Sequence, residues 1–435
     1  MVHRGYARAA AFVAIAAASV ILAAYGGPST THASAAKGPV RISLWESHSP
    51  GGPPGKSMVA LVNLFNRTHR GIQVELTVTK ASHKLLGAFA AGDAPVLAEV
   101  SHYDAAFITA HAIKSWNPYL SGAGGMSAVE RGAIFPVTWT NGQVNGQHWR
   151  LQANVKVSQL SYNIGLFRKA GISSPPATWA QLAADVAILH KRLPAVVPLA
   201  WKDSSAHILP PFLSNGGTLF APGSHEKKAN FVTPAAVETF TFFRRLYANH
   251  QMIFAHGSEI RADFAAGKLA IADGTSAGYQ KLLDAVAGRF QIGVIPFPAG
   301  STGHTANLAQ GLGFVLVAHH TPAQYRAAAT FVQWWFSAQP QAYWGSRSGY
   351  PPESKLALSA MPSGYLRRYP GISVAVRILE SPYTVARPVA TAYKEVQGSL
   401  DAAFFNAVTG KASVMSALRS LETQANAYLS GSSAL

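Results

Sequence analysis

An alternation of strand and helix patterns in the first hundred residues constrains the fold of this chain more than any other feature. Residues 40–45, VRISLW, are expected to form a strand, and apolar residues at helical spacing follow over residues 58–65. A second strand is expected at residues 72–77. Residues 84–100 then combine a helix rich in small residues, a glycine stop and a buried strand. This order predicts a parallel sheet with helices on both faces, and therefore an α/β fold.

The length of the chain indicates two domains. With 435 residues, of which 49% are hydrophobic, the chain is too long for one ordinary core. We expect two domains of about 150 to 200 residues each. The apolar content is that of a globular protein.

The charge of the chain is strongly positive because acidic residues are scarce. There are 36 Lys and Arg but only 19 Asp and Glu, which gives a net charge of +17. The basic residues are scattered and follow no nucleic-acid-binding motif, so we expect no nucleic-acid partner. A protein with few carboxylates loses little stability when carboxylates protonate. We therefore predict an exported protein of an acidophile, exposed to an acidic exterior.

The N-terminus has the pattern of a secretory signal peptide, assigned to residues 1–35. Arg4 and Arg8 precede an apolar run over residues 9–24, and Ala33-Ser34-Ala35 is a suitable cleavage site. The run is marginal for spanning a bilayer, so we expect cleavage rather than a retained anchor. The predicted location is secreted, cell-surface or periplasmic.

The absence of cysteine excludes several kinds of chemistry. The chain has no cysteine, so it has no disulfide, no thiol catalysis and no thiolate metal ligand. A lipid anchor attached through cysteine is excluded for the same reason.

The central stretch of the chain, LSYNIGLFRKAGISSPPATWAQL, contains a strand, a short helix and the start of a longer helix. Gly171 is expected to cap the short helix, Pro175 and Pro176 prevent its continuation, and Thr178 caps a helix that runs to about residue 190. This stretch resembles the segment Y-N-x-x-x-F-x-K-A-G-(x)n-P-P-x-T-W-x-x-L of bacterial family 1 extracellular solute-binding proteins. These are the sugar and glycerol-phosphate receptors of ABC importers.

Further motifs of the same family follow in the same order along residues 40–430. Residues 84–95 resemble its K-L-x-x-A-x-A-A-G-x-A-P motif, residues 264–274 its F-x-x-G-x-x-A-M-x-x-G motif, and residues 345–352 its S-G-Y-x-P turn. The resemblance implies a periplasmic-binding-protein type II fold, in which two lobes, each a mostly parallel sheet flanked by helices, enclose a ligand cleft. It also implies a monomer that binds a small hydrophilic solute and delivers it to a membrane permease, without a cofactor.

The resemblance also implies that each lobe is built from two segments of the chain. Lobe one is expected to comprise residues 40–155 with 308–350, and lobe two residues 156–304 with 353–430. The crossings near residues 155, 305 and 351 would form the hinge.

A secreted serine hydrolase is the alternative reading of the sequence. Residues 274–278 form a G-x-S-x-G motif around Ser276, between an expected strand and a helix. Only His304, His319 and His320 follow, with Asp284 as the sole intervening acid, and this arrangement is cramped for a triad. We interpret the motif as a glycine-rich loop at the cleft, where the N-terminus of the helix suits an anionic or hydroxylated ligand.

No motif predicts a metal site or a glycosidase. The 16 histidines have no metal-ligand spacing such as H-E-x-x-H. The acids Glu46, Glu99, Asp104 and Asp203 are scattered, and no motif pairs them. We therefore predict neither a metal nor catalysis.

Two tryptophans are candidates for contact with the ligand. Trp45 and Trp201 each follow a strand, at the position where loops of a cleft are expected, and aromatic faces stack on sugars. Trp334 and Trp335 lie on the apolar face of a helix and are expected in the core, as is Trp179.

The resemblance to the glycerol-phosphate receptors assigns further site residues. Tyr350, Gly311 and Thr275 match positions of their ligand site. His102, Lys156 and Gln397 take the places of a glutamate, a serine and an arginine, and a further tyrosine is replaced by alanine. Loss of that arginine removes a bidentate phosphate ligand, although Lys156 and His102 restore positive charge. The predicted ligand is glycerol 3-phosphate, a glycerophosphodiester or a sugar.

Overall fold

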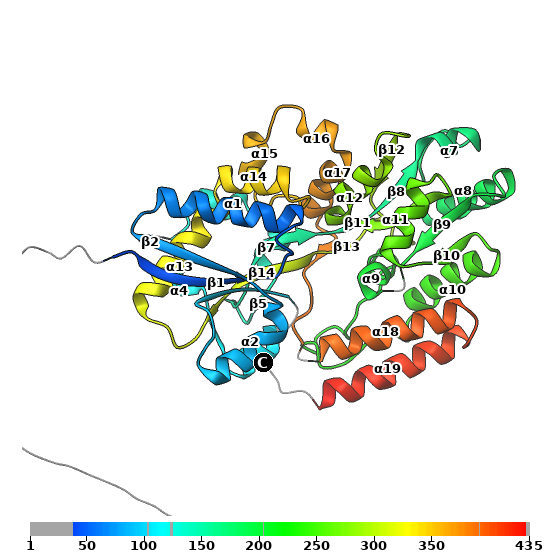
Figure 1. The fold of residues 1–435 in the computed structure, drawn as a ribbon. Helices are drawn as coiled ribbons and strands as arrows, with labels where there is room; N and C mark the ends of the chain where they lie inside the picture. Colours follow the sequence, from blue (N-terminus) through cyan, green and yellow to red (C-terminus); the bar gives the residue numbers. More distant parts are fainter. Residues whose placement is uncertain (1–37, 102–103, 122–124, 203, 391, 432–435) are drawn as a thin grey trace, which may run out of the picture. The chain divides into compact units, whose positions relative to one another are not determined.

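The computed structural model describes residues 38–101, 104–121, 125–202, 204–390 and 392–431. The predicted signal peptide and His102 lie outside these residues. Pro39–Leu435 form one compact unit, and it contains two separate mixed sheets with helices packed around them (Figure 1). The expected α/β class is confirmed.

The first sheet contains the strands expected near the N-terminus. Its order is β2 (Ile72–Val78), β1 (Val40–Glu46), β3 (Leu97–Val100), β14 (Gln310–Val317) and β4 (Ile113–Lys114), and β7 (Leu151–Lys156) also pairs with β14. β1 is parallel to β2 and β3, whereas β14 is antiparallel to β3, β4 and β7. The sheet is therefore mixed rather than mostly parallel, because β14 enters from a distant part of the chain without a crossover helix.

The second sheet is also mixed. Its order is β10 (Met252–Phe254), β9 (Val197–Trp201), β11 (Leu269–Thr275), β8 (Ser158–Asn163) and β12 (Ile292–Ile295). β9 is parallel to β10 and β11, whereas β8 is antiparallel to β11 and β12. Only Val157 separates β7 from β8, so the chain passes directly from one sheet to the other. A short parallel pair joins β13 (Asn307–Leu308), which lies just before β14 in the chain, to β15 (Thr384–Val385).

The helices begin and end where local chemistry predicts. α1 (Pro53–Thr68) carries the predicted apolar face, and α2 (Ala81–Ala91) ends at Gly92, whose φ of 79° is left-handed. Thr178 and Gln181 form a capping box at the start of α8 (Trp179–Arg192). Three longer helices lie in the C-terminal part of the chain: α13 (Pro322–Phe336), α18 (Tyr393–Val408) and α19 (Val414–Ser430).

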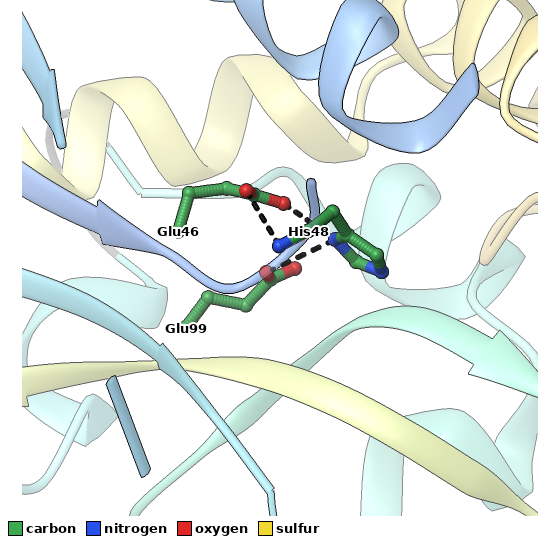
Figure 2. A group of neighbouring side chains, drawn as sticks. All are labelled: Glu46, His48 and Glu99. Carbon is green, nitrogen blue, oxygen red and sulfur yellow. Dashed lines mark hydrogen bonds and ion pairs between the residues drawn. The ribbon is translucent and has the colours of Figure 1, made fainter. Parts of the chain in front are cut away.

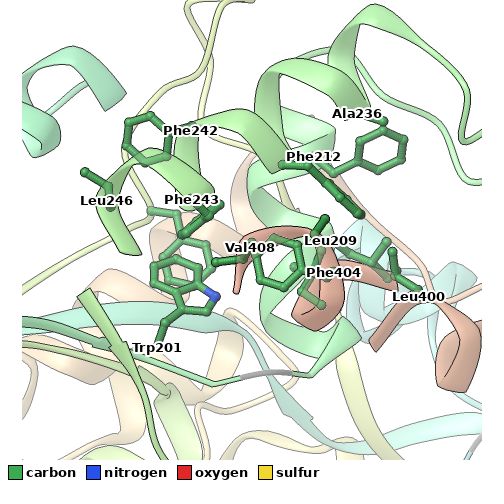
Figure 3. Packing of buried hydrophobic residues seen from close by; sticks show 14 of the residues in the cluster. Trp201, Leu209, Phe212, Ala236, Phe242, Phe243, Leu246, Leu400, Phe404 and Val408 are labelled. Carbon is green, nitrogen blue, oxygen red and sulfur yellow. The ribbon is translucent and has the colours of Figure 1, made fainter. Parts of the chain in front are cut away.

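Each sheet has its own hydrophobic core. Around the second sheet, α10 (Pro234–Ala248) contributes Phe243, α9 (Ser205–Ser214) contributes Phe212 and α18 contributes Phe404 to the core that contains Trp201 (Figure 3). Trp335 and Trp179 are buried as expected, and the indole of Trp179 donates a hydrogen bond of 3.1 Å to the Pro298 carbonyl. Among the described residues, no helix combines the length and apolar character needed to cross a bilayer.

The remaining elements are short or pack at the periphery. The short strands are β5 (Gln143–Val144) and β6 (Gln147–His148), which form a hairpin. The remaining helices are α3 (Asp104–Thr109), α4 (Asn117–Leu120), α5 (Ala128–Ala133), α6 (Pro136–Thr140), α7 (Ile164–Lys169), α11 (Gly257–Ala265), α12 (Ser276–Val286), α14 (Ala338–Arg347), α15 (Leu356–Ala360), α16 (Tyr365–Arg368) and α17 (Pro370–Glu380).

Candidate ligand-binding site

A pocket of about 280 Å³ lies at the junction of β11 and α12. Elements of the second sheet form most of its wall, whereas Lys156 at the end of β7 and Tyr350 after α14 come from the elements around the first sheet. The lining residues are Lys156, Ser161, Lys202, Gly257, Ile260, Arg261, Ala272, Asp273, Gly274, Thr275, Ala277, Gly278, Tyr279, Lys281, Leu282 and Tyr350. The pocket therefore combines hydroxyl groups, the start of a helix and several cations.

Two other cations, Arg387 and Lys202, act on the buried Lys156 beside this pocket. Burial, together with the positive charges of Arg387 and Lys202, lowers the pKa of Lys156 to about 8. Burial also lowers the pKa of Arg387. The ion pairs among the described residues include none with Lys156, Lys202 or Arg387. A buried group of like charges without a counterion favours the binding of an anion.

Asp273 is the single acid among the described lining residues, and both of its carboxylate oxygens already have hydrogen-bond partners. Its Oδ1 lies 2.7 Å from Nδ1 of the buried His207, and its Oδ2 accepts a hydrogen bond of 3.0 Å from the backbone N–H of Lys202. Burial lowers the pKa of His207. Asp273 thus positions the loop that carries Lys202.

The motif around Ser276 has a structural role. Ser276 is fully buried, its Oγ accepts a hydrogen bond of 3.2 Å from the backbone N–H of Val157, and its own N–H donates to the Val157 carbonyl at 2.9 Å. These bonds fix the start of α12 against the crossing between the two sheets. Nothing in the structure supports the serine hydrolase alternative.

The structure brings only part of the predicted site together. Lys156, Thr275 and Tyr350 line the pocket. Gly311 does not: it pairs with Val155 in the first sheet, and its φ of 133° allows close contact with the backbone of Asn154.

The two predicted tryptophans lie elsewhere. Trp201 is 1% exposed and packs against Phe243 and Phe297, because α9 and α10 cover the strand on which it lies. Trp45 is partly buried against a small cluster that includes Leu85 and Phe107. Both therefore contribute to packing instead of lining the pocket.

Arg387 is a residue that the sequence comparison missed. Gln397, the position predicted for the family arginine, lies on α18 and does not line the pocket. Arg387 follows β15 ten residues earlier, beside Lys156, and its Nε and Nη1 are buried without a hydrogen-bond partner among the described residues. In the sequence, Arg387 is recognisable only as an arginine followed by proline in an extended segment. This pattern is too common to identify a ligand-binding residue.

A second polar cluster, Glu46, His48 and Glu99, lies at the end of β1 and β3 in the first sheet (Figure 2). His48 Nδ1 contacts Glu46 Oε1 and lies 3.5 Å from Glu99 Oε2. Burial raises the pKa of Glu46 to about 7. Burial lowers the pKa of His48, but the neighbouring negative charge of Glu99 and the hydrogen bond with Glu46 outweigh it, so the pKa is raised overall.

Glu46 and Glu99 are scattered in the sequence, but the strand register places them together. Trp45 pairs with Ala98 in the parallel strands β1 and β3, so the next residues, Glu46 and Glu99, are neighbours. His48 Nε2 lies 3.1 Å from the hydroxyl of Tyr350, which connects this cluster to the pocket.

Comparison with known proteins identifies the family of this chain. The sn-glycerol-3-phosphate-binding periplasmic protein UgpB of Pectobacterium atrosepticum is 22% identical over 413 residues, which cover 89% of this chain and 91% of that protein. Its counterpart in Yersinia pestis is 23% identical over 79% of this chain and 82% of that protein.

Solved structures show the same fold. The cyclic alpha-maltosyl-1,6-maltose binding protein of Arthrobacter globiformis superposes with a TM-score of 0.78 at 20% identity, covering 90% of this chain and 99% of the other. UgpB of Mycobacterium tuberculosis in complex with glycerophosphocholine gives 0.76 at 19% identity, covering 91% and 99%. At 20% and 19% sequence identity, the structural similarity shows that the fold is shared.

The family profile described as bacterial extracellular solute-binding protein matches residues 60–363, well over half of the chain. This match confirms the resemblance derived from the sequence motifs. The chain belongs to the bacterial extracellular solute-binding proteins.

Proposed function

We propose that this protein binds a small anionic solute, a glycerol phosphate or a glycerophosphodiester, and delivers it to an ABC importer without chemical turnover. The observation that carries this proposal is the group of three cations, Lys156, Lys202 and Arg387, beside a pocket in which Asp273 is the single described acid. The named function of the UgpB relatives, binding of sn-glycerol 3-phosphate, supports the same ligand class.

The charges favour a phosphate over a neutral sugar. Arg387 and Lys202 raise the free-energy cost of keeping Lys156 charged, and an anion bound beside Lys156 would lower that cost. Lys156 supplies a point charge, whereas the guanidinium of Arg387 supplies a planar pair of donors that fits two phosphate oxygens. A neutral sugar would leave the cations without a counterion.

The rest of the pocket supplies groups suited to a glycerol moiety. The hydroxyls of Thr275, Ser161 and Tyr350 can donate to and accept from ligand hydroxyls. Ala277 and Gly278 lie in the first turn of α12, where backbone N–H groups lack partners within the helix and favour negative charge.

Solute binding is proposed to close two lobes around the ligand. We infer lobes of residues 40–155 with 308–350 and of residues 156–304 with 353–430, with the β7–β8 crossing as part of the hinge. By these bounds Tyr350 belongs to lobe one, Thr275 and Lys202 belong to lobe two, and Lys156 lies at the crossing between them, so a bound solute contacts both lobes only when they are closed. Its differential affinity shifts the equilibrium toward the closed form, which the permease recognises. We propose that the protein is exported and acts as a monomer.

Calorimetric titration tests this proposal. Sn-glycerol 3-phosphate, glycerophosphocholine, maltose and trehalose are titrated separately into the protein. We expect saturable binding of the phosphate compounds, and a Lys156→Ala or Arg387→Ala variant should bind about tenfold to a hundredfold more weakly, because each loses a charge-assisted hydrogen bond.

Matched variants control for general effects of charge. Lys191→Ala and Arg377→Ala each remove an exposed cation of the same type elsewhere and should bind like the wild type. Binding of the sugars alone, or equal affinity of the Lys156→Ala and Lys191→Ala variants, would contradict the proposal.

A further inference from the structure

The side chains of Glu46, His48 and Glu99 bring three metal-ligand atoms together in the first sheet. One atom from each residue lies within 4.8 Å of the other two. Glu46 and Glu99 come from adjacent parallel strands, and His48 extends from the segment after β1 so that its ring lies beside both carboxylates (Figure 2). Both carboxylates are fully buried, and the imidazole is largely buried.

Each of the three side chains is held in place through its other polar atom. Glu46 Oε2 accepts a hydrogen bond of 2.7 Å from the backbone N–H of His48, and Glu99 Oε1 accepts one from the side-chain amide of Asn154. His48 Nε2 lies 3.1 Å from the Tyr350 hydroxyl. Glu46 Oε1, Glu99 Oε2 and His48 Nδ1 therefore face one another. Hydrogen bonds to the outer atoms of the ligands are typical of metal sites, where they orient the ligands.

The single proton on His48 Nδ1 cannot serve both carboxylates. Nδ1 of His48 carries at most one proton, and its contact with Glu46 Oε1 uses it. Glu99 Oε2 lies 3.5 Å from Nδ1 and has no hydrogen-bond partner, although the side chain is fully buried. An unpaired carboxylate oxygen is costly in a buried position, and the second carboxylate beside it adds repulsion. A divalent cation would neutralise both.

We propose that Glu46, His48 and Glu99 bind one divalent first-row transition-metal ion, for which Zn²⁺ is the best match. Imidazole nitrogen with carboxylate oxygen is a donor set that suits Zn²⁺, and three protein ligands leave the fourth tetrahedral position for water. Mg²⁺ and Ca²⁺ prefer oxygen ligands in larger number, so the histidine selects against them.

The test uses the full chain without an affinity tag, after treatment with a chelator. Titration with ZnCl₂ at pH 7 is expected to show one equivalent of saturable binding, and MgCl₂ in large excess should not displace it. Glu99→Gln preserves the shape of the side chain, and His48→Asn removes the nitrogen ligand. Each is expected to weaken Zn²⁺ binding at least tenfold. His190→Asn removes an exposed histidine on α8 and should leave the affinity unchanged.

X-ray absorption of the zinc-loaded wild type provides a readout that does not depend on the folding of any variant. The proposal expects one imidazole and oxygen ligands at about 2.0–2.2 Å from the zinc. It is overturned if the wild type shows no saturable equivalent, if a folded Glu99→Gln variant binds as tightly as the wild type, or if the zinc is surrounded only by water oxygens. None of these readouts involves the solute, so they are independent of the proposed transport function.

Discussion

At the scale of single residues, the proposed anion binding is expected to depend on pH through Lys156. Its pKa is lowered to about 8 by burial and by the positive charges of Arg387 and Lys202. The amine is therefore charged below about pH 8 and neutral above it. A bound anion stabilises the charged form of the amine. Lys156 therefore holds its proton more tightly in the complex than in the free protein.

The titration of Lys156 should make the affinity for an anionic ligand depend on pH. The dissociation constant for sn-glycerol 3-phosphate should be constant between about pH 7 and pH 8, where the phosphate is a dianion, and should rise toward pH 10, by up to about tenfold per pH unit. Calorimetric titration across this range measures it. In Lys156→Gln the rise should be absent, whereas Lys191→Ala should retain it. A rise of equal size in both variants would assign the effect to another group.

Gly311 is required by the backbone rather than by the ligand. A Cβ added at this position would lie 1.9 Å from the carbonyl oxygen of Asn154, and the φ of 133° is rarely adopted by other residues. Gly311→Ala is expected to lower the free energy of unfolding by about 2 kcal/mol or more, as measured by urea denaturation.

Gly87 offers a matched control for this substitution. It lies inside α2, where an added Cβ meets nothing within 4 Å. Gly87→Ala should therefore stabilise the protein by about 0.5 to 1 kcal/mol. If Gly311→Ala were as well tolerated as Gly87→Ala, the close approach of β14 to β7 would not be needed for stability.

At the scale of elements, the capping box at the start of α8 is a local feature with a measurable contribution. Thr178 Oγ1 accepts a hydrogen bond of 3.2 Å from the backbone N–H of Gln181, and the Gln181 side chain accepts one of 3.2 Å from the N–H of Thr178. Thr178→Ala should lower the free energy of unfolding by about 1 kcal/mol in urea denaturation. Thr178→Ser keeps the acceptor oxygen and should recover most of this loss. Equal destabilisation by both would attribute the effect to packing of the methyl group.

The pairing of β1 with β3 determines which acidic residues lie side by side. The sequence predicted β1 and β3 as strands, and their parallel pairing followed from the βαβ order. Glu46 and Glu99 nevertheless looked scattered, because they are 53 residues apart and no local motif links them. The register of the two strands, which depends on packing in the sheet, places them side by side.

At the scale of the whole molecule, two features favour stability at low pH: acidic residues are scarce, and burial raises the pKa of some of them. Burial raises the pKa of Asp185 to about 6 and holds the pKa of Glu353 well above its usual value. In the folded state these groups bind protons at a pH where the unfolded chain has released them. By linkage, they make the folded state more stable as the pH falls.

The corresponding prediction concerns stability in acid. The free energy of unfolding should not decrease between pH 7 and about pH 5, because Asp185 should raise it as the pH falls through about 6 and Glu353 contributes in the same direction. Urea denaturation at a series of pH values measures this profile. Asp185→Asn should flatten the part of the profile near pH 6, and Asp93→Asn, at an exposed acid after α2, should not. A steep loss of stability by pH 5 would contradict the predicted adaptation to an acidic exterior.

The sequence by itself determined the elements that depend on local chemistry. Gly92, Thr178 and the alternation of strand and helix patterns indicated the α/β class and the helix ends, and collinear motifs identified the family. Local hydrogen bonds and side-chain periodicity are properties of neighbouring residues, so they can be read from the chain.

Only the tertiary structure decided which side chains share a site. Trp201 follows a strand as a cleft residue would, yet α9 and α10 bury it in the core. Arg387, not Gln397, lies beside Lys156, and Glu99 meets Glu46 and His48. These neighbours are far apart in sequence, and the free energy that brings them together comes from burial of the two cores and from the pairing of distant strands. That information is not local, and no single stretch of the chain contains it.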